Sequence, residues 1–422
     1  MAAPAGADCG EAPGESGVMA TGRLLAQALG SYQADGRAHT TLPLLTAAGN
    51  KLDAALLKPM LLKKLQLLGS AVDDNAVLVQ DVLEGCGLDK WVDRPDEPAS
   101  KRAKQDDDAA AAEAERQAST DKEQHREDVR CVFKQLAREW STDGEEERRR
   151  IHAPLLAAIL KYCPPSNSVC GNSSGSGRGF PGSGQPLSHL LGTKTDPEHG
   201  SPTSSKAPLV LVPGSGLGRL ATEIAGHGYR VQACESGAAM AAMAEFLLQH
   251  IEPEAEYRVH PFIHDAANRS DSAAQARALL VPDKDPLAML ASAPGFSLAA
   301  TDFVEEYARP EHAGQWDVIV TCFFIDTAPN PLVYLRTISH CLRSPGGRWI
   351  NTGPLLWHHA LSDPYECLQL SAAEMLSASE LCGFTIEVQS APAYHTSDVS
   401  AATEPPHHQS HCARVPTLEW QY

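Results

Sequence analysis

Residues 208–228 read PLVLVPGSGLGRLATEIAGHG, and this stretch decides the fold. Its apolar start predicts a buried strand, the glycines predict a tight turn, and the following residues predict a helix. The next segment, YRVQACE (229–235), predicts a second strand. A strand, a glycine-rich turn, a helix and another strand are typical of a βαβ unit in a parallel sheet.

Three later segments continue this alternation. WDVIVTCFFIDTA (316–328) predicts a strand, PLVYLRTISHCLR (331–343) a helix, and GGRWINTGPL (346–355) another strand. Strands that alternate with helices imply a parallel sheet covered by helices on both faces. We therefore expect an α/β fold, with a Rossmann-like, doubly wound domain over residues 208–390.

The chain before this domain is expected to be largely helical. Residues 1–40 lack sustained periodicity and are predicted to be disordered. Residues 41–163 form the predicted helical N-terminal region, in which an apolar segment at 75–88 packs against a Leu-rich helix at 42–68. Residues 93–120 are charged and rich in alanine, which predicts a solvated linker.

Two further helices are predicted at 121–140 and 145–162. The first carries an apolar stripe at helical spacing, formed by Val129, Val132, Phe133, Leu136 and Trp140. Residues 164–207 are dominated by Pro, Gly and Ser, which predicts a flexible insertion. Residues 391–422 show no β pattern and are treated as an atypical tail.

The composition argues against several classes of protein. A net charge of −18 disfavours binding to nucleic acid by phosphate neutralisation. No apolar run reaches the ~18 residues that a membrane span needs, and no secretory signal is visible. The 11 cysteines include no CxxC pair, so we expect a reduced, intracellular protein without a metal site. The expected location is the cytoplasm, with the nucleus as a second, and a homodimer is kept open.

The glycine turn and an acid after the next strand form a candidate nucleoside site. Gly214, Gly216 and Gly218 let a ligand approach the backbone closely, although a plain strand–helix turn would look the same. Glu235 ends the second strand, where a carboxylate can bind the two ribose hydroxyls of an adenine nucleoside. The alternative for Glu235 is an exposed loop acid. Together the two features indicate an adenosine-containing cofactor.

Two details favour S-adenosylmethionine over a nicotinamide dinucleotide. The G-x-G-x-G spacing differs from the G-x-G-x-x-G that accommodates a pyrophosphate, and no hydride-transfer pair is evident. Asp302 and Phe303 can bind the adenine amino group and pack against its ring, although this dipeptide is more often ordinary loop sequence.

Six segments of the chain resemble the carnosine N-methyltransferase family. They are FKQLAREWS (133–141), LVPGSGLGRLATEIAGHGY (211–229), HPFIHDAANR (260–269), VPDKDP (281–286), TCFFIDTAPN (321–330) and PGGRWINTGPLLWHH (345–359). The resemblance implies transfer of a methyl group from S-adenosylmethionine to an imidazole nitrogen of carnosine, which gives anserine. The implied partner is a small dipeptide substrate.

The resemblance also assigns site residues. The implied cofactor contacts are Gln135, Arg138, Gly214, Glu235, Asp302, Phe303 and Cys322, and the implied substrate contacts are Asp326 and His358. From the residues alone, Gln135 and Arg138 would lie on a solvated helix face, and Cys322 would be a small buried hydrophobe. With the resemblance, that helix face becomes a lid over the cofactor.

Asp326 is the candidate that binds the imidazole. It follows the apolar residues 319–325 and should lie at the carboxyl end of a central strand, where doubly wound folds bind ligands. Its alternative is a cap on the next helix. A carboxylate that faces one imidazole N–H leaves the lone pair on the other nitrogen. His358 is a candidate for binding the substrate or removing its proton, although the adjacent His359 blurs this assignment.

Past Val388 the resemblance ends, so the substrate-contacting Tyr of the family cannot be placed. Either the tail is an altered terminus that leaves a sheet edge unpaired, or the substrate pocket differs. Two other functions therefore stay open: methylation of a histidine in a peptide or protein, and a catalytically silent protein that only binds the cofactor.

Overall fold

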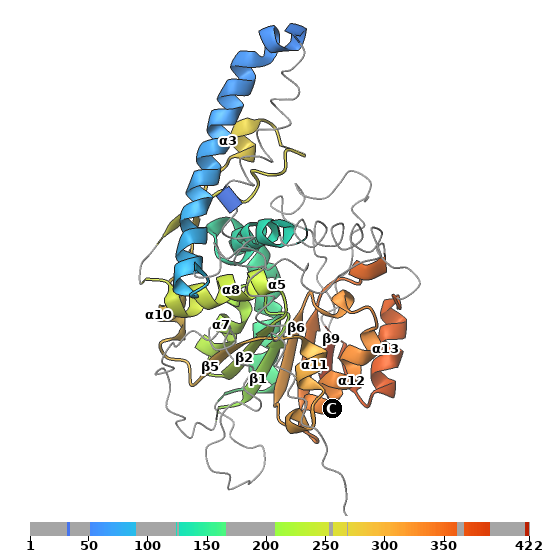
Figure 1. Cartoon of the computed structure of the whole chain (residues 1–422). Helices are drawn as coiled ribbons and strands as arrows, with labels where there is room; N and C mark the ends of the chain where they lie inside the picture. The colour runs from blue at the N-terminus through green and yellow to red at the C-terminus, as the bar shows by residue number, and fades with distance from the viewer. Residues whose placement is uncertain are drawn as a thin grey trace, which may run out of the picture.

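The computed structural model describes residues 32–33, 51–89, 124, 126–165, 207–252, 256–267, 269–360, 367–388 and 418–421 (Figure 1). The predictions of disorder before residue 40, of the charged linker at 93–120 and of the flexible insertion at 164–207 fall almost entirely outside these residues. So does most of the tail after residue 388.

The central sheet has seven strands in the order β5-β2-β1-β6-β7-β9-β8. Their bounds are β5 (Phe296–Ala300), β2 (Arg230–Glu235), β1 (Leu209–Pro213), β6 (Val318–Cys322), β7 (Arg348–Thr352), β9 (Leu418–Gln421) and β8 (Thr385–Val388). The first five are parallel to one another, and β9 is antiparallel to both of its neighbours. This topology confirms the predicted Rossmann-like α/β fold.

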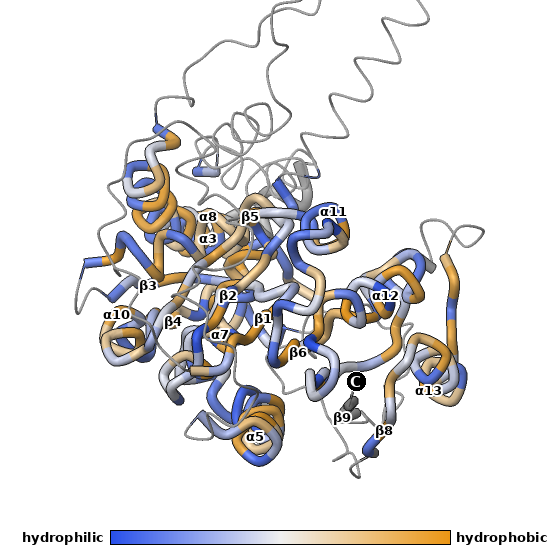
Figure 2. The backbone as a smooth tube through the Cα atoms, turned by 90° about the horizontal axis from the view of Figure 1, so that it is seen from below, coloured by the Kyte–Doolittle hydropathy of each residue, from blue (hydrophilic) through white to orange (hydrophobic). Residues whose placement is uncertain are grey.

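Helices cover both faces of the sheet, and the strands are accordingly apolar on both sides. On one face α5 (Glu145–Tyr162), α7 (Arg219–Gly226) and α8 (Ala238–Glu245) pack on side chains such as Val210, Val212 and Val231. On the other face α11 (Phe303–Tyr307), α12 (Pro331–Cys341) and α13 (Ala372–Leu381) pack on Leu211, Ile319 and Trp349. Figure 2 shows α5 and α11 on opposite sides of the strands.

The helical N-terminal region packs on the sheet domain in two places: Glu145–Tyr162 contacts β7, and Lys51–Gly85 contacts residues 246–250 and 257–259. Its elements are α3 (Lys51–Gly85), a helix over residues 126–139, η3 (Thr142–Gly144) and α5. Val82, Phe133 and Leu136 of this region share one apolar cluster with Met243 and Leu247 of the Rossmann-like domain. Among the described residues no helix is both long and apolar enough to cross a membrane.

The prediction of two packed helices at 42–68 and 75–88 was wrong, because α3 is one continuous helix through both described segments (Figure 1). The residues between the two apolar segments contain no proline, and the single Gly69 costs a helix only about 1 kcal/mol relative to alanine. Ala71 and Val72 are buried there, so the apolar stripe continues without a break.

The remaining short elements connect these layers. Strands β3 (Tyr257–Val259) and β4 (Leu279–Val281) form a separate antiparallel pair beside α3. The other elements are η4 (Phe246–His250), α9 (Ser272–Gln275), α10 (Pro286–Leu290), η5 (Pro310–His312), η6 (Ile325–Thr327) and η7 (His358–Ala360).

The prediction that the tail holds no β structure was also wrong. Residues 418–421 form β9, which lies between β7 and β8 and pairs with both. A four-residue strand is too short for alternation to stand out, and its partners are distant in the sequence. Backbone pairing with two neighbours, which local pattern does not report, places this segment in the sheet.

A proline in β9 tests whether this strand closes the sheet. Glu419→Pro removes a backbone N–H from a strand that is paired on both sides, so the ladder loses a donor where proline is not tolerated. We expect the midpoint of thermal unfolding to fall by about 5 °C or more. Tyr422→Pro, one residue beyond the strand, is the matched control. Equal midpoints for the two variants would contradict the placement of β9.

Candidate functional site

The predicted site residues converge on one edge of the sheet. Apart from Gln135 and Arg138, which lie on the helix over residues 126–139, each of them follows or ends a parallel strand, and the carboxyl ends of parallel strands meet at a single edge. Gly214 follows β1, Glu235 ends β2, Asp302 follows β5, Cys322 ends β6, and Asp326 and His358 come after β6 and β7. The strand order reverses between β1 and its neighbour β6, which is where doubly wound folds bind ligands.

The glycine turn after β1 requires glycine for two reasons. Gly214 and Gly216 have φ of 63° and 56°, a left-handed conformation that side chains disfavour. In addition, a Cβ on Gly214 would lie 2.4 Å from the Phe324 ring, and a Cβ on Gly216 would lie 2.5 Å from Glu139 Oε1. The turn is therefore packed closely by the segment after β6 and by the helical N-terminal region.

Glu235 lies beside this turn, as predicted. Its Oε2 accepts the Gly216 N–H at 2.9 Å and its Oε1 accepts the Gly237 N–H at 2.8 Å. Burial raises the pKa of the carboxyl, and the nearby Glu139 adds to this rise. Each carboxylate oxygen can accept more than one hydrogen bond, so both can still bind ribose hydroxyls. Glu235 is half-buried at the end of β2, so the alternative of an exposed loop acid does not describe it.

Asp302 and Phe303 have structural roles of their own. Asp302 caps α11, because its Oδ1 accepts the N–H groups of Val304 and Glu305. The Phe303 ring is 3% exposed and packs edge-on against Phe324 at 5.4 Å between centroids. This position does not support the predicted packing of that ring against an adenine.

Asp326 lies in η6 and is almost completely buried, with 1% of its side chain exposed. Its Oδ2 accepts the Leu356 N–H at 3.1 Å, whereas its Oδ1 is buried without a hydrogen-bond partner. Burial raises the pKa of this carboxyl. Asn330, and not Asp326, caps the next helix, which rules out the alternative reading of Asp326. A buried acceptor without a donor indicates a ligand that supplies one.

His358 lies at the entrance to this carboxylate. Its Nε2 is 3.8 Å from Asp326 Oδ2, and 56% of its side chain is exposed. The residue before it, Trp357, has φ of 52°, and Phe323 after β6 has φ of 54°. Non-glycine residues in this region are strained, and such strain gathers at functional sites.

Gln135, Arg138 and Cys322 meet where the helical region faces the end of β6. The Arg138 guanidinium lies 5.8 Å from the centre of the Phe323 ring and pairs with Glu147 at 2.9 Å. Burial raises the pKa of the Cys322 thiol to about 12, and Arg138 opposes this rise. Gln135 and Arg138 are only partly exposed, so their helix face is not the solvated one that the residues alone predicted.

The sequence analysis missed Glu139, which holds the glycine turn from the other side. Its carboxylate accepts the N–H groups of Leu217 and Arg219, both at 3.1 Å, and the amide of Gln135 at 2.5 Å. The next residue, Trp140, donates its indole N–H to the Leu217 carbonyl at 3.1 Å. Glu139 is three residues from Leu136 on the apolar stripe, and a charge on a buried stripe is the signal that could have identified it.

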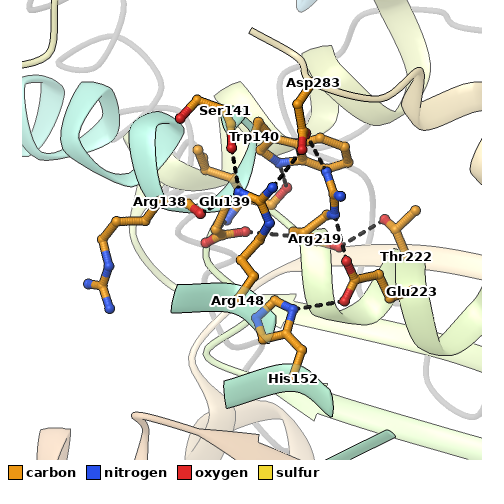
Figure 3. Close-up of polar contacts among 12 residues, drawn as sticks. Arg138, Glu139, Trp140, Ser141, Arg148, His152, Arg219, Thr222, Glu223 and Asp283 are labelled. Atoms are coloured by element: carbon orange, nitrogen blue, oxygen red, sulfur yellow. Dashed lines mark hydrogen bonds and ion pairs between the residues drawn. The ribbon is translucent and has the colours of Figure 1, made fainter. Parts of the chain in front are cut away.

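A network of buried ion pairs adjoins the contact between Glu139 and the glycine turn (Figure 3). The Asp283 carboxylate accepts hydrogen bonds from the guanidinium groups of Arg148 at 2.5 Å and Arg219 at 2.7 Å. The exposed fraction of the side chain is 6% for Asp283, 7% for Arg148 and 2% for Arg219. Arg219 also pairs with Glu223, which accepts His152 at 2.8 Å. Burial alone would raise the pKa of Glu223, but the hydrogen bonds from His152 and Arg219 lower it to about 2.

A cavity of about 410 Å³ opens beside this network, between α5, α7 and the start of α10. Its lining includes Thr222, Gly226 and Met289, which lie away from the carboxyl edge of the sheet. This cavity therefore does not define the candidate active site, which rests on the convergence of side chains described above.

The fold and the site define a class of protein: a Rossmann-like α/β protein with a candidate nucleoside site at the carboxyl edge of its sheet and the buried Asp326 carboxylate beside it. The family model described as carnosine N-methyltransferase matches residues 188–411. The chain belongs to this family.

Curated relatives agree with this assignment. The carnosine N-methyltransferase of Schizosaccharomyces pombe is 38% identical over 230 residues, which cover 54% of this chain and 52% of that protein. The mouse carnosine N-methyltransferase is 34% identical over 261 residues, 62% of this chain and 55% of that protein. The chain thus spans about half the length of the curated relatives it matches.

A solved S-adenosylmethionine-dependent methyltransferase of Methanosarcina mazei is 13% identical, with a TM-score of 0.32 over 51% of this chain and 92% of that chain.

Removing the shared carboxylate tests the buried network. Asp283→Ala leaves the charges of Arg148 and Arg219 buried without this partner, so we expect the free energy of unfolding to fall by about 3–5 kcal/mol. Asp285→Ala is the matched control, because it removes only the cap of α10, worth about 1 kcal/mol. Both are measured by urea unfolding. Equal losses for the two variants would mean that Asp283 is not a structural centre.

Proposed function

We propose that this chain is an S-adenosylmethionine-dependent N-methyltransferase that acts on the imidazole of carnosine, giving anserine, or of a related histidine-containing dipeptide. Membership of the family supports this activity. The observation that carries it is the buried Asp326 Oδ1, an acceptor without a donor beside a nucleoside-type edge. The proposed partner is a small molecule. The homodimer and the cytoplasmic and nuclear locations stay predictions from the sequence.

The residues at the edge fit the proposed cofactor. Glu235 would accept two ribose hydroxyls, and Gly214 in the neighbouring turn is exposed, so its backbone can approach a bound nucleoside. Arg138 and Gln135 approach from the helical region, and the guanidinium suits the carboxylate end of the cofactor. When bound, S-adenosylmethionine supplies a methyl group that is activated on a positively charged sulfur.

Asp326 is the residue that would orient the substrate. A neutral imidazole carries a proton on one nitrogen and a lone pair on the other. An imidazole N–H donated to Asp326 Oδ1 would satisfy this buried oxygen and direct the lone pair away from the carboxylate. The positioned ring then needs only an in-line approach to the reacting carbon, which is a large part of what an enzyme can contribute to such a transfer.

Asp326 would also accept the proton that the imidazole must lose after methylation. A ring methylated on one nitrogen carries a positive charge until the N–H on its other nitrogen is released. That N–H faces Asp326, and the raised pKa of this carboxyl makes it a better proton acceptor than an ordinary aspartate. His358, exposed and 3.8 Å from Asp326 Oδ2, can pass the proton on to water.

The test is an assay of purified protein with methyl-labelled S-adenosylmethionine and carnosine, read by mass spectrometry of the dipeptide. We expect a methylated imidazole with carnosine and no product with β-alanylalanine, which lacks the ring. Asp326→Asn places an amide N–H₂ opposite the substrate N–H, so we expect turnover to fall by about 100-fold or more with cofactor affinity unchanged. Asp271→Asn, at the exposed cap of α9, is the matched control. Full turnover by Asp326→Asn would remove Asp326 from the mechanism.

The raised pKa of Asp326 predicts how stability depends on pH. Below the pKa that Asp326 has in the unfolded chain, its carboxyl is neutral in both the folded and the unfolded state. The folded protein then holds no buried charge at this position. As the pH rises through the higher pKa of the folded state, the folded protein must hold a buried charge and loses stability. Asp326→Asn does not carry this charge.

We therefore expect Asp326→Asn to gain stability over the wild type as the pH rises from about 4, with the gain levelling off once the pH exceeds the raised pKa of Asp326 in the folded state. The measurement is the free energy of urea unfolding across pH. Asp271→Asn should show no such gain, because Asp271 is exposed. A gain that instead grows towards low pH would contradict the sign of the shift.

A further inference from the structure

The first turn of α7 has the geometry of an anion site, but the protein itself occupies it. In dinucleotide-binding folds the N–H groups after the first strand bind a pyrophosphate at the helix N-terminus. Here the Leu217 and Arg219 N–H groups donate to Glu139 Oε1 and Oε2, each at 3.1 Å. The Gly216 N–H donates to Glu235 at 2.9 Å. Two carboxylates therefore take the donors that a phosphate would use.

Glu139 is fixed in this position from several sides. It is 8% exposed, and Gln135 donates to its Oε1. The neighbouring Trp140 is tied to the Leu217 carbonyl and lies under the Arg219 guanidinium, 4.8 Å from the ring centre. Because Arg219 is also held by Asp283, the carboxylate and the turn cannot separate without breaking the buried network.

The negative charge of Glu139 matters for cofactor selection as much as its shape does. Its Oε1 lies 2.5 Å from where a Gly216 Cβ would be, so the carboxylate borders the turn on the side opposite Glu235. Both charges act in a partly buried setting, where attraction for a cation exceeds its value in water. S-adenosylmethionine carries one positive charge more than its product, S-adenosylhomocysteine, and a dinucleotide or ADP carries negative charge instead.

We propose that Glu139 is a specificity-determining positioning residue, which fills the anion site of α7, excludes a pyrophosphate and favours a cationic adenosine cofactor over a neutral or anionic one. This inference rests on the proposed function, since it concerns which cofactor the same site accepts. It assigns the helical N-terminal region a part in cofactor selection, in addition to its packing on the sheet.

The test measures four ligands by isothermal titration: S-adenosylmethionine, S-adenosylhomocysteine, adenosine and ADP. Glu139→Gln keeps the shape, removes the charge and sets its N–H₂ against one backbone donor, a defect that affects both sulfur ligands alike. We therefore expect S-adenosylmethionine to lose about tenfold more affinity than S-adenosylhomocysteine. For Glu139→Ala, which frees the two N–H groups, we expect ADP to bind about tenfold more tightly than it binds the wild type. Glu311→Gln and Glu311→Ala, at an exposed glutamate in η5, are matched controls.

Equal weakening of the two sulfur ligands in Glu139→Gln would overturn the proposal, and so would an unchanged ADP affinity in Glu139→Ala. A variant that is merely damaged does not gain affinity for ADP. Should the variants fail to fold, the wild type still decides: ADP that binds more than about tenfold tighter than adenosine would show an open anion site and overturn the proposal. A wild type that binds neither S-adenosylmethionine nor S-adenosylhomocysteine would refute the proposed function instead, while the ADP measurements would still test Glu139.

Discussion

The carboxylate of Asp283 pairs with two buried guanidinium groups from different parts of the chain. Arg219 is the first residue of α7 and directly follows the glycine turn, whereas Arg148 comes from the helical N-terminal region. Arg148 also donates to the carbonyls of Arg138 and Ser141, so it fixes the end of the helix that carries Gln135 and Glu139. Asp283 thus links the turn to the helix that approaches it, in addition to the direct hydrogen bonds that Glu139 and Trp140 make with the turn. For this reason the N-terminal region is positioned as part of the core.

The side chains that stabilise the fold and those of the candidate site lie on different parts of the sheet. Its two faces are apolar and bury their side chains against helices, which is the dominant favourable contribution to folding. Its carboxyl edge instead collects groups that cost stability: Glu235 and Asp326, whose carboxyl pKa values burial raises, and Phe323 and Trp357 with strained backbones. Unfavourable groups of this kind are tolerated where they serve a site, and they are concentrated here at the end of β2 and after β6 and β7.

The sequence predicts those parts of the structure whose signals are local. Strands β1, β2, β6 and β7 and helices α7 and α12 stand out because apolar runs and the glycine turn report their own conformation. The position of Glu235 and Asp326 at the carboxyl edge follows from those strands. The continuity of α3 depends on burial of Ala71 and Val72, and the place of β9 depends on distant partners, so neither is visible in a local pattern. The role of Glu139 requires knowing that its helix faces the glycine turn, which only tertiary structure provides.

The position of β9 has a consequence for how the protein is made. The strand that sits between β7 and β8 is synthesised after both of them, so β7 leaves the ribosome with one edge open. At about 5–20 residues per second, the interval between residues 352 and 418 lasts several seconds. During that time the row of unpaired backbone groups along β7 can recruit a strand from another chain. The open edge of β7 is therefore a site of possible intermolecular pairing that closes only once β9 has been synthesised.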